Sequence, residues 1–168
     1  MKYALSDSDI GKCFRFAIEV TKKTKNYYKL RNKYASTEKM IFDHFIAKMS
    51  EIATWALMTS ENKECTYPNF NITDKADNGD LKIITELKNI TLHCKVVRHD
   101  SPVTDSWLIQ TTELSRIDPS DFFVLCKFFD PNEIEICTIA EAGRIKWQKP
   151  RNASLSSKSA CYLNDLYI

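Results

Sequence analysis

The chain is poor in glycine: its 168 residues include only Gly11, Gly79 and Gly143, and no two of these lie close together. Phosphate-binding loops of the P-loop and dinucleotide-binding types need several glycines within one turn. The sequence therefore excludes both kinds of site, and we expect no nucleotide cofactor. Collagen-like and glycine-rich disordered classes are excluded for the same reason.

Long apolar runs are missing as well. Runs such as residues 122–126 are far shorter than the roughly 20 residues that cross a bilayer. The first residues reach Asp7 without a signal-type apolar stretch. We therefore expect a protein with no membrane association, located in the cytoplasm of a prokaryotic or phage-infected cell.

The chain also lacks a large excess of charge of either sign. The chain has 24 Lys and Arg against 22 Asp and Glu, a net charge of +2, which excludes histone-like proteins and acidic tails. The apolar share of 43% is ordinary for one globular domain, and we expect residues 1–168 to form one. Six scattered cysteines without CxxC or CxxH spacing indicate free thiols.

Helical periodicity is confined to the first part of the chain. Apolar residues at helical spacing predict one helix from the caps at residues 6–9 to about Lys25, and another from Ser36 or Thr37 to about Thr59. Beyond Pro68, short segments separated by Asn, Asp and Gly predict strands. The predicted strands are 70–72, 81–85, 90–97, 108–109, 122–128 and 133–139, with a turn at 130–132.

This order of elements favours an α+β fold. Residues 1–60 are mainly helical and residues 68–168 mainly strands, which predicts a mixed β-sheet flanked by helices. The strands 81–85 and 90–97 are expected to form an antiparallel hairpin.

Three polar side chains share one face of the 90–97 strand. Thr91, His93 and Lys95 alternate with apolar neighbours because successive side chains of a strand point to opposite faces. Asp80 opens the preceding strand, so a twisted hairpin brings it toward His93 and Lys95. Carboxylate and imidazole groups ligate divalent cations, and a nearby lysine can orient a water that attacks phosphorus.

This pattern resembles the signature of the PD-(D/E)xK nuclease superfamily, in particular its restriction-endonuclease-like members. That signature is a helix glutamate, an aspartate opening a β-hairpin, and acid-x-Lys on the second strand. Glu51 resembles the glutamate, Asp80 the aspartate, and His93-Cys94-Lys95 the acid-x-Lys. Residues 106–110 resemble the next strand of such nucleases, and the resemblance extends from about residue 40 to the C-terminus.

The resemblance implies a restriction-endonuclease-like core and a metal-dependent DNA endonuclease, sequence-specific in the manner of type II restriction enzymes. Its products would carry 5′-phosphate ends. The implied metal ligands are the side chains of Asp80, Glu51 and His93 with the Cys94 backbone carbonyl, and Lys95 would position the attacking water.

His93 departs from the family pattern, which has Glu or Asp at this position. A neutral imidazole brings no negative charge, and Mg²⁺ prefers oxygen ligands. We therefore expect Mg²⁺-dependent activity that is weaker, or a preference for Mn²⁺. The alternative function is a degraded nuclease-fold protein that binds nucleic acid or a partner protein without cleavage.

Two alternative assignments of the motif stay open at this point. Glu86-Leu87-Lys88 also reads as acid-x-Lys, but it follows Asp80 by only six residues, too few to reach adjacent hairpin strands in the usual way. Asp77 is an alternative to Asp80.

DNA affinity should come from local basic groups, because a net charge of +2 gives little long-range attraction. Basic residues alternate with tyrosines over residues 22–34, a mixture that suits a nucleic-acid backbone and its bases. A homodimer is expected if both strands of a palindromic double-stranded site are cut. The expected DNA-binding residues are Lys25, Lys29, Arg31, Lys33, Gln110, Lys146, Lys149 and Arg151.

Overall fold

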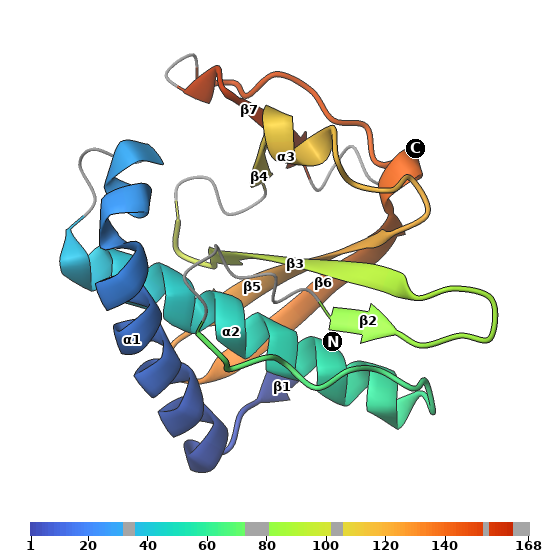
Figure 1. The fold of residues 1–168 in the computed structure, drawn as a ribbon, viewed down its shortest axis with the longest axis horizontal. Helices are drawn as coiled ribbons and strands as arrows, with labels where there is room; N and C mark the ends of the chain where they lie inside the picture. Colours follow the sequence, from blue (N-terminus) through green and yellow to red (C-terminus); the bar gives the residue numbers. More distant parts are fainter. Residues whose placement is uncertain (32–35, 73–80, 102–105, 153–154, 163–168) are drawn as a thin grey trace.

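The computed structural model describes residues 1–31, 36–72, 81–101, 106–152 and 155–162, with only the backbone for residues 25–31 (Figure 1). Helices and strands both contribute, so the α+β prediction is confirmed. In chain order the elements are β1 (Lys2–Ala4), α1 (Asp7–Arg31), α2 (Thr37–Ser60), β2 (Leu81–Ile83), β3 (Ile90–Arg98), β4 (Ser106–Gln110), α3 (Thr111–Leu114), β5 (Phe122–Phe129), β6 (Glu133–Glu141), the 3-10 turn η1 (Ala142–Arg144) and β7 (Lys158–Tyr162).

The main sheet is mixed, as predicted. Its five strands run in the order β1-β6-β5-β3-β2, and β3 and β5 are parallel while the other neighbours are antiparallel. The hairpin prediction is confirmed by the pairing of Leu81 with Leu92 and Ile83 with Ile90. The predicted strand 108–109 lies within β4, which pairs with β7 in a separate two-stranded sheet.

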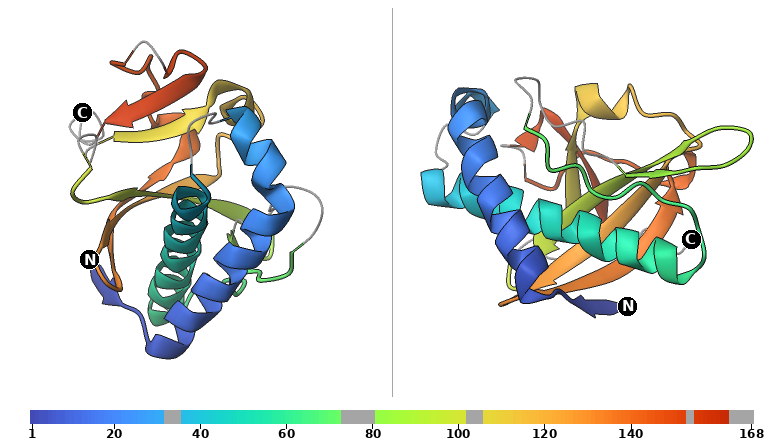
Figure 2. Two further views of the ribbon diagram at one scale, coloured as in Figure 1. Left: turned by 90° about the vertical axis from the view of Figure 1, so that its left-hand side faces the viewer. Right: turned by 60° about the horizontal axis from the view of Figure 1, so that its bottom comes forward.

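The two faces of the main sheet have different covers (Figures 1 and 2). On one face α2 packs over Leu92, Val124 and Phe128, and α1 packs against α2. On the other face β4 and β7 enclose a second apolar cluster with Phe123 and Leu125. Side-chain alternation along β5 thus feeds both cores, and the polar row of β3 points toward the second one.

Local sequence explains where the helices begin. The Ser6 hydroxyl accepts a hydrogen bond from the Asp9 backbone N–H at 3.2 Å, and Ser36 accepts one from Lys39 at 3.1 Å. Both are N-caps that satisfy a free backbone donor of the first turn. The first helix extends beyond the predicted end near Lys25, because residues 26–31 contain no glycine or proline to stop it.

The predicted strand at residues 70–72 is wrong. This segment has no regular structure and runs beside α1, with the Phe70 ring packed edge-on to Phe16 at 5.7 Å between ring centroids. The Asn69 carbonyl accepts a hydrogen bond from Lys48 Nζ at 3.0 Å. The segment is held by these side-chain contacts and not by the strand pairing that its sequence pattern suggested.

The six cysteines are free thiols, as expected. Burial, together with the nearby Glu51 carboxylate, raises the pKa of Cys13 to about 12, so its sulfur stays protonated at neutral pH. Within the described ranges no helix is both long enough and apolar enough to span a membrane.

Two tryptophans of the second core offer a matched test of this packing. The indole N–H of Trp107 donates to the Cys126 carbonyl at 3.1 Å, whereas the buried indole N–H of Trp147 has no partner among the described residues. Trp107→Phe should cost about 2–3 kcal/mol through the lost bond and a small cavity, while Trp147→Phe should change stability by less than about 1 kcal/mol. Urea unfolding followed by circular dichroism measures both, and equal costs would contradict this packing.

Candidate functional site

His93 and Lys95 lie on the face of β3 that points toward the second core. His93 is only 8% exposed, and its ring is tilted over Phe123 with 5.3 Å between ring centroids. Lys95 lies two residues further along the strand and is partly exposed. The sheet therefore presents the imidazole and the ammonium side by side, as the sequence alternation predicted.

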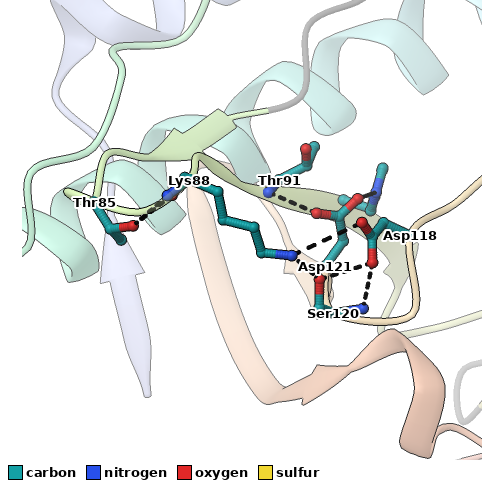
Figure 3. A network of polar contacts seen from close by, with 7 residues as sticks. Thr85, Lys88, Thr91, Asp118, Ser120 and Asp121 are labelled. Carbon is teal, nitrogen blue, oxygen red and sulfur yellow. Dashed lines mark hydrogen bonds and ion pairs between the residues drawn. The ribbon is translucent and has the colours of Figure 1, made fainter.

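A carboxylate from the turn before the neighbouring parallel strand lies beside His93. Asp121, just before β5, places Oδ2 3.3 Å from His93 Nε2, and its Oδ1 accepts the Thr91 backbone N–H at 2.9 Å. Figure 3 shows Asp121, in the turn before β5, beside Thr91 near the start of β3. The imidazole and carboxylate are both nearly buried, with side-chain exposures of 10% and 13%.

A polar network holds the turn that carries Asp121 (Figure 3). The Asp118 carboxylate accepts the backbone N–H and the hydroxyl of Ser120 at 2.9 and 2.7 Å, which lowers the pKa of Asp118. Lys88, from the loop between β2 and β3, donates to the Ser120 hydroxyl and lies 3.8 Å from Asp118. The loop before β3 and the turn before β5 are thereby tied together.

Lys95 has a carboxylate partner from a different element. Its Nζ donates to Glu113 Oε1 at 2.9 Å, and Glu113 lies on the short helix α3 that follows β4. The two side chains are 26% and 46% exposed. Within the site, the Lys95 side chain is therefore partly exposed to solvent, whereas His93 is buried.

The structure places Glu51 on the opposite side of the sheet. Glu51 is on α2, and its Oε2 lies 2.7 Å from the Nζ of Lys48, a lysine only 1% exposed that also packs against the Phe16 ring. Since α2 covers the face away from His93, the sheet separates the Glu51 carboxylate from His93 and Lys95. The described residues do not bring the predicted glutamate to the predicted histidine and lysine.

Among the remaining residues of the predicted motif, the structure describes Cys94, whose backbone carbonyl lies within β3. The Cys94 side chain points to α2, where Sγ lies 3.4 Å from Thr54 Oγ1. Asp80 and its alternative Asp77 are outside the described residues, which resume at Leu81, paired with Leu92. The alternative Glu86-Leu87-Lys88 falls in the exposed loop between β2 and β3.

The expected DNA-binding residues fall into two groups. Lys25, Lys29 and Arg31 lie on the last turns of α1, where only the backbone is described, and Lys33 is outside the described residues. The other four lie in or near the two-stranded sheet of β4 and β7. Gln110 ends β4, and Lys146 and Lys149 are exposed after η1. The Arg151 guanidinium stacks on the Tyr162 ring, 4.2 Å from its centroid.

The donor groups near His93 fit a metal ion in part. Among the described residues, no three His, Cys, Asp or Glu side chains gather closely enough to hold one. The pair itself has the right chemistry, because metal-binding histidines commonly donate their second ring N–H to a carboxylate. The described residues supply the imidazole and its carboxylate, whereas the further carboxylate expected from the sequence, that of Asp80, lies outside the described residues.

Asp121 and Glu113 were not found by sequence reasoning. Asp121 directly precedes the most apolar strand of the chain, and this position was the one available signal. Asp121 contacts His93 because β3 and β5 pair in parallel, which places Phe123, two residues after Asp121, beside His93. The contact of Glu113 with Lys95 requires β4 and α3 to lie over the main sheet, and no local sequence pattern predicts that arrangement.

Comparison with known proteins identifies no relative: no protein-family model, no curated protein and no solved structure matches this chain. The function proposed below therefore rests on the geometry of the site and on the motif resemblance in the sequence.

Proposed function

We propose that this chain is a divalent-metal-dependent endonuclease that hydrolyses DNA phosphodiester bonds, built on a restriction-endonuclease-like core. The observation that carries the proposal is the shared face of β3, where the His93 imidazole and the Lys95 ammonium stand two residues apart with the Asp121 carboxylate beside the imidazole. A buried acid–imidazole pair next to a partly exposed lysine suits phosphoryl chemistry.

Each side chain has a distinct role in this proposal. His93, with Asp80, would hold Mg²⁺ or Mn²⁺, and a bound ion neutralises charge on the phosphate and activates the attacking water. Lys95 orients that water and offsets the negative charge that develops in the transition state. Its contact with Glu113 is partly exposed, so a phosphate group can displace the carboxylate at little cost.

Glu51 takes no part in the chemistry as we propose it. Its carboxylate lies with Lys48 on the α2 side of the sheet, and the ion pair is buried under α1 and the 65–72 segment. This assignment replaces the role that the family resemblance implied for Glu51.

DNA would approach from the side of the main sheet that β4, α3 and β7 cover. Lys146, Lys149 and Arg151 are exposed on the segment between η1 and β7, in the same layer as the helix that carries Glu113. These cations provide phosphate contacts without requiring a large net charge. Cutting both strands of a symmetric site would then use two copies of the chain.

Incubation of supercoiled plasmid and phage DNA with the intact chain tests the proposal. We expect cleavage with Mn²⁺, slower cleavage with Mg²⁺, and none with a chelator. Discrete fragments would indicate sequence specificity, and nicking would indicate a nonspecific nuclease with the same chemistry. Retarded DNA in a gel without cleavage under either ion would instead support the alternative, a nuclease fold that only binds.

A further inference from the structure

A cavity of about 310 Å³ lies between α1 and the 65–72 segment, on the helical side of the main sheet. Its apolar walls are the rings of Phe16 and Phe70, which meet edge to face with 5.7 Å between centroids. The Phe16 ring is buried, whereas Phe70 is partly exposed. The charged rim consists of three side chains of α1, namely Lys12, Arg15 and Glu19. Aromatic walls with a few charged groups are typical of ligand sites of this size.

The rim of the cavity is positive at one end. The Arg15 guanidinium reaches back along α1, with Nη1 3.6 Å from the position that a Cβ atom on Gly11 would take. Lys12 lies at the same end, where the Asp9 carboxylate holds its ammonium at 3.2 Å. Glu19 lies one turn beyond Arg15. The cavity therefore favours a phosphate near the two cations and a hydrogen-bond donor, such as the N–H of a base, near the carboxylate.

Positive charge continues along α1 beyond the cavity. Lys22 and Lys23 are both exposed, and Lys23 Nζ donates to the Ile72 carbonyl at 3.3 Å. Residues 12–23 hold four cations and one carboxylate, a surplus of three, whereas the net charge of the whole chain is +2. This part of α1 thus concentrates positive charge beside the cavity, which complements a polyanion.

Two aromatic rings of the 65–72 segment lie alongside these cations. Tyr67 is 45% exposed, and its ring lies 6.1 Å from that of Phe70 with an interplanar angle of 35°. The Asp9 carboxylate and the nearby Tyr67 phenol raise the pKa of Lys12, which places Tyr67 next to the positive end of the cavity. Trp55 supports Tyr67 from the side. Aromatic faces beside a row of cations are the arrangement by which proteins bind single-stranded nucleic acid.

We infer that this cavity and the adjoining Tyr67 ring bind single-stranded nucleic acid, with a base packed on Phe70 and phosphates on Lys12 and Arg15. The inference goes beyond the proposed cleavage and does not depend on it, because α1 and α2 lie on the other face of the main sheet from Lys95. A duplex fits less well, since its bases are stacked on one another and their faces cannot reach the rings.

Fluorescence anisotropy with a labelled oligothymidylate of about 12 nucleotides tests this inference. A chelator is present, so that no metal-dependent cleavage occurs. The matched probe is an abasic strand of the same length, which carries the same phosphates without bases. We expect the native chain to bind the oligothymidylate about 10- to 100-fold more tightly than the abasic strand, because only the former can stack on the rings.

Phe70→Leu should remove most of this difference, since leucine keeps an apolar contact with Phe16 but has no flat face. Phe14→Leu is the matched control, because Phe14 is an exposed aromatic residue of the same helix that packs on Phe45 instead. Tyr67→Leu should also weaken binding to the oligothymidylate. Circular dichroism melting shows whether each variant is folded, and Tyr67→Leu takes the place of Phe70→Leu if the latter unfolds.

Arg15→Ala should weaken the binding of both strands. It should also reduce the slope of log affinity against log salt by about 0.7, the value for one phosphate contact of a single strand. Lys63→Ala removes an equally exposed kind of charge beyond the end of α2, where Lys63 pairs with Glu61, and should leave both quantities unchanged.

Equal affinity of the native chain for the two strands would overturn the inference, and so would folded Phe70→Leu and Tyr67→Leu variants that bind as the native chain does. Thymidine 5′-monophosphate that binds as tightly as the strand would overturn it in favour of a free nucleotide. Oligoglutamate that binds as tightly would overturn it in favour of an acidic protein partner. Failure of the proposed function is seen separately, as strand binding in the chelator without DNA cleavage in Mn²⁺.

Discussion

Lys95→Ala should lower the rate of DNA cleavage about a hundred- to ten-thousand-fold, the range associated with losing a positioned acid–base or charge-stabilising group. The ammonium of Lys95 lies on the polar face of β3, two residues from His93. Stability should change little, because the Lys95–Glu113 pair is partly exposed and such pairs contribute less than about 1 kcal/mol.

Lys82→Ala is the matched control for this prediction. Lys82 lies on β2, in the same hairpin, where it pairs with Thr91 and is exposed to solvent. Its loss removes the same charge from the same face of the hairpin, but at the position opposite Thr91 rather than beside His93. Rates measured under single-turnover conditions with Mn²⁺ should therefore match the native chain, and an equal loss in both variants would assign the effect to general DNA affinity.

Glu51→Gln should destabilise the fold by about 3 kcal/mol and lower the melting temperature by about 6–12 °C, without a specific effect on cleavage. Lys48 is 1% exposed, and its ammonium lies 2.7 Å from the Glu51 carboxylate. Removing the negative charge leaves a buried cation without this partner, a large penalty in protein interiors. Thermal and urea unfolding measure the cost.

Replacing both partners distinguishes a structural ion pair from a catalytic glutamate. The double variant Lys48→Met, Glu51→Leu should recover most of the stability, since apolar residues of similar size suit this buried position. The exposed pair of Lys63 and Glu61 is the control, and Glu61→Gln should cost less than about 0.5 kcal/mol. If Glu51→Gln folds as stably as the native chain yet cleaves no DNA, the catalytic role implied by the family resemblance is restored.

The sequence was informative where a local pattern determines local structure. Caps and apolar spacing identified both long helices, and alternation placed His93 and Lys95 on one face of β3 with Leu92 on the other. These features depend on neighbours within a few residues. The segment 70–72 failed because its apolar residues pack against a helix instead of pairing in a sheet.

Contacts between distant segments were beyond the sequence. No pattern in residues 118–123 reveals that β5 runs parallel to β3, yet this pairing brings Asp121 to His93. The sequence correctly placed Glu51 on a helix. The direction of its side chain, however, depends on which face of α2 packs against the sheet. Lys48, one turn earlier on α2 and deeply buried, holds that carboxylate.

The nature of the cleaved DNA ends tests the central claim most directly. Water attack positioned by Lys95 at a metal site on β3 should leave 5′-phosphate and 3′-hydroxyl ends, which DNA ligase rejoins without prior treatment. We expect linearised plasmid from the Mn²⁺ reaction to be resealed in this way. Fragments with 3′-phosphate ends, cleavage that persists in a chelator, or cleavage confined to RNA with cyclic phosphate ends would contradict the account, because each requires a different attacking group.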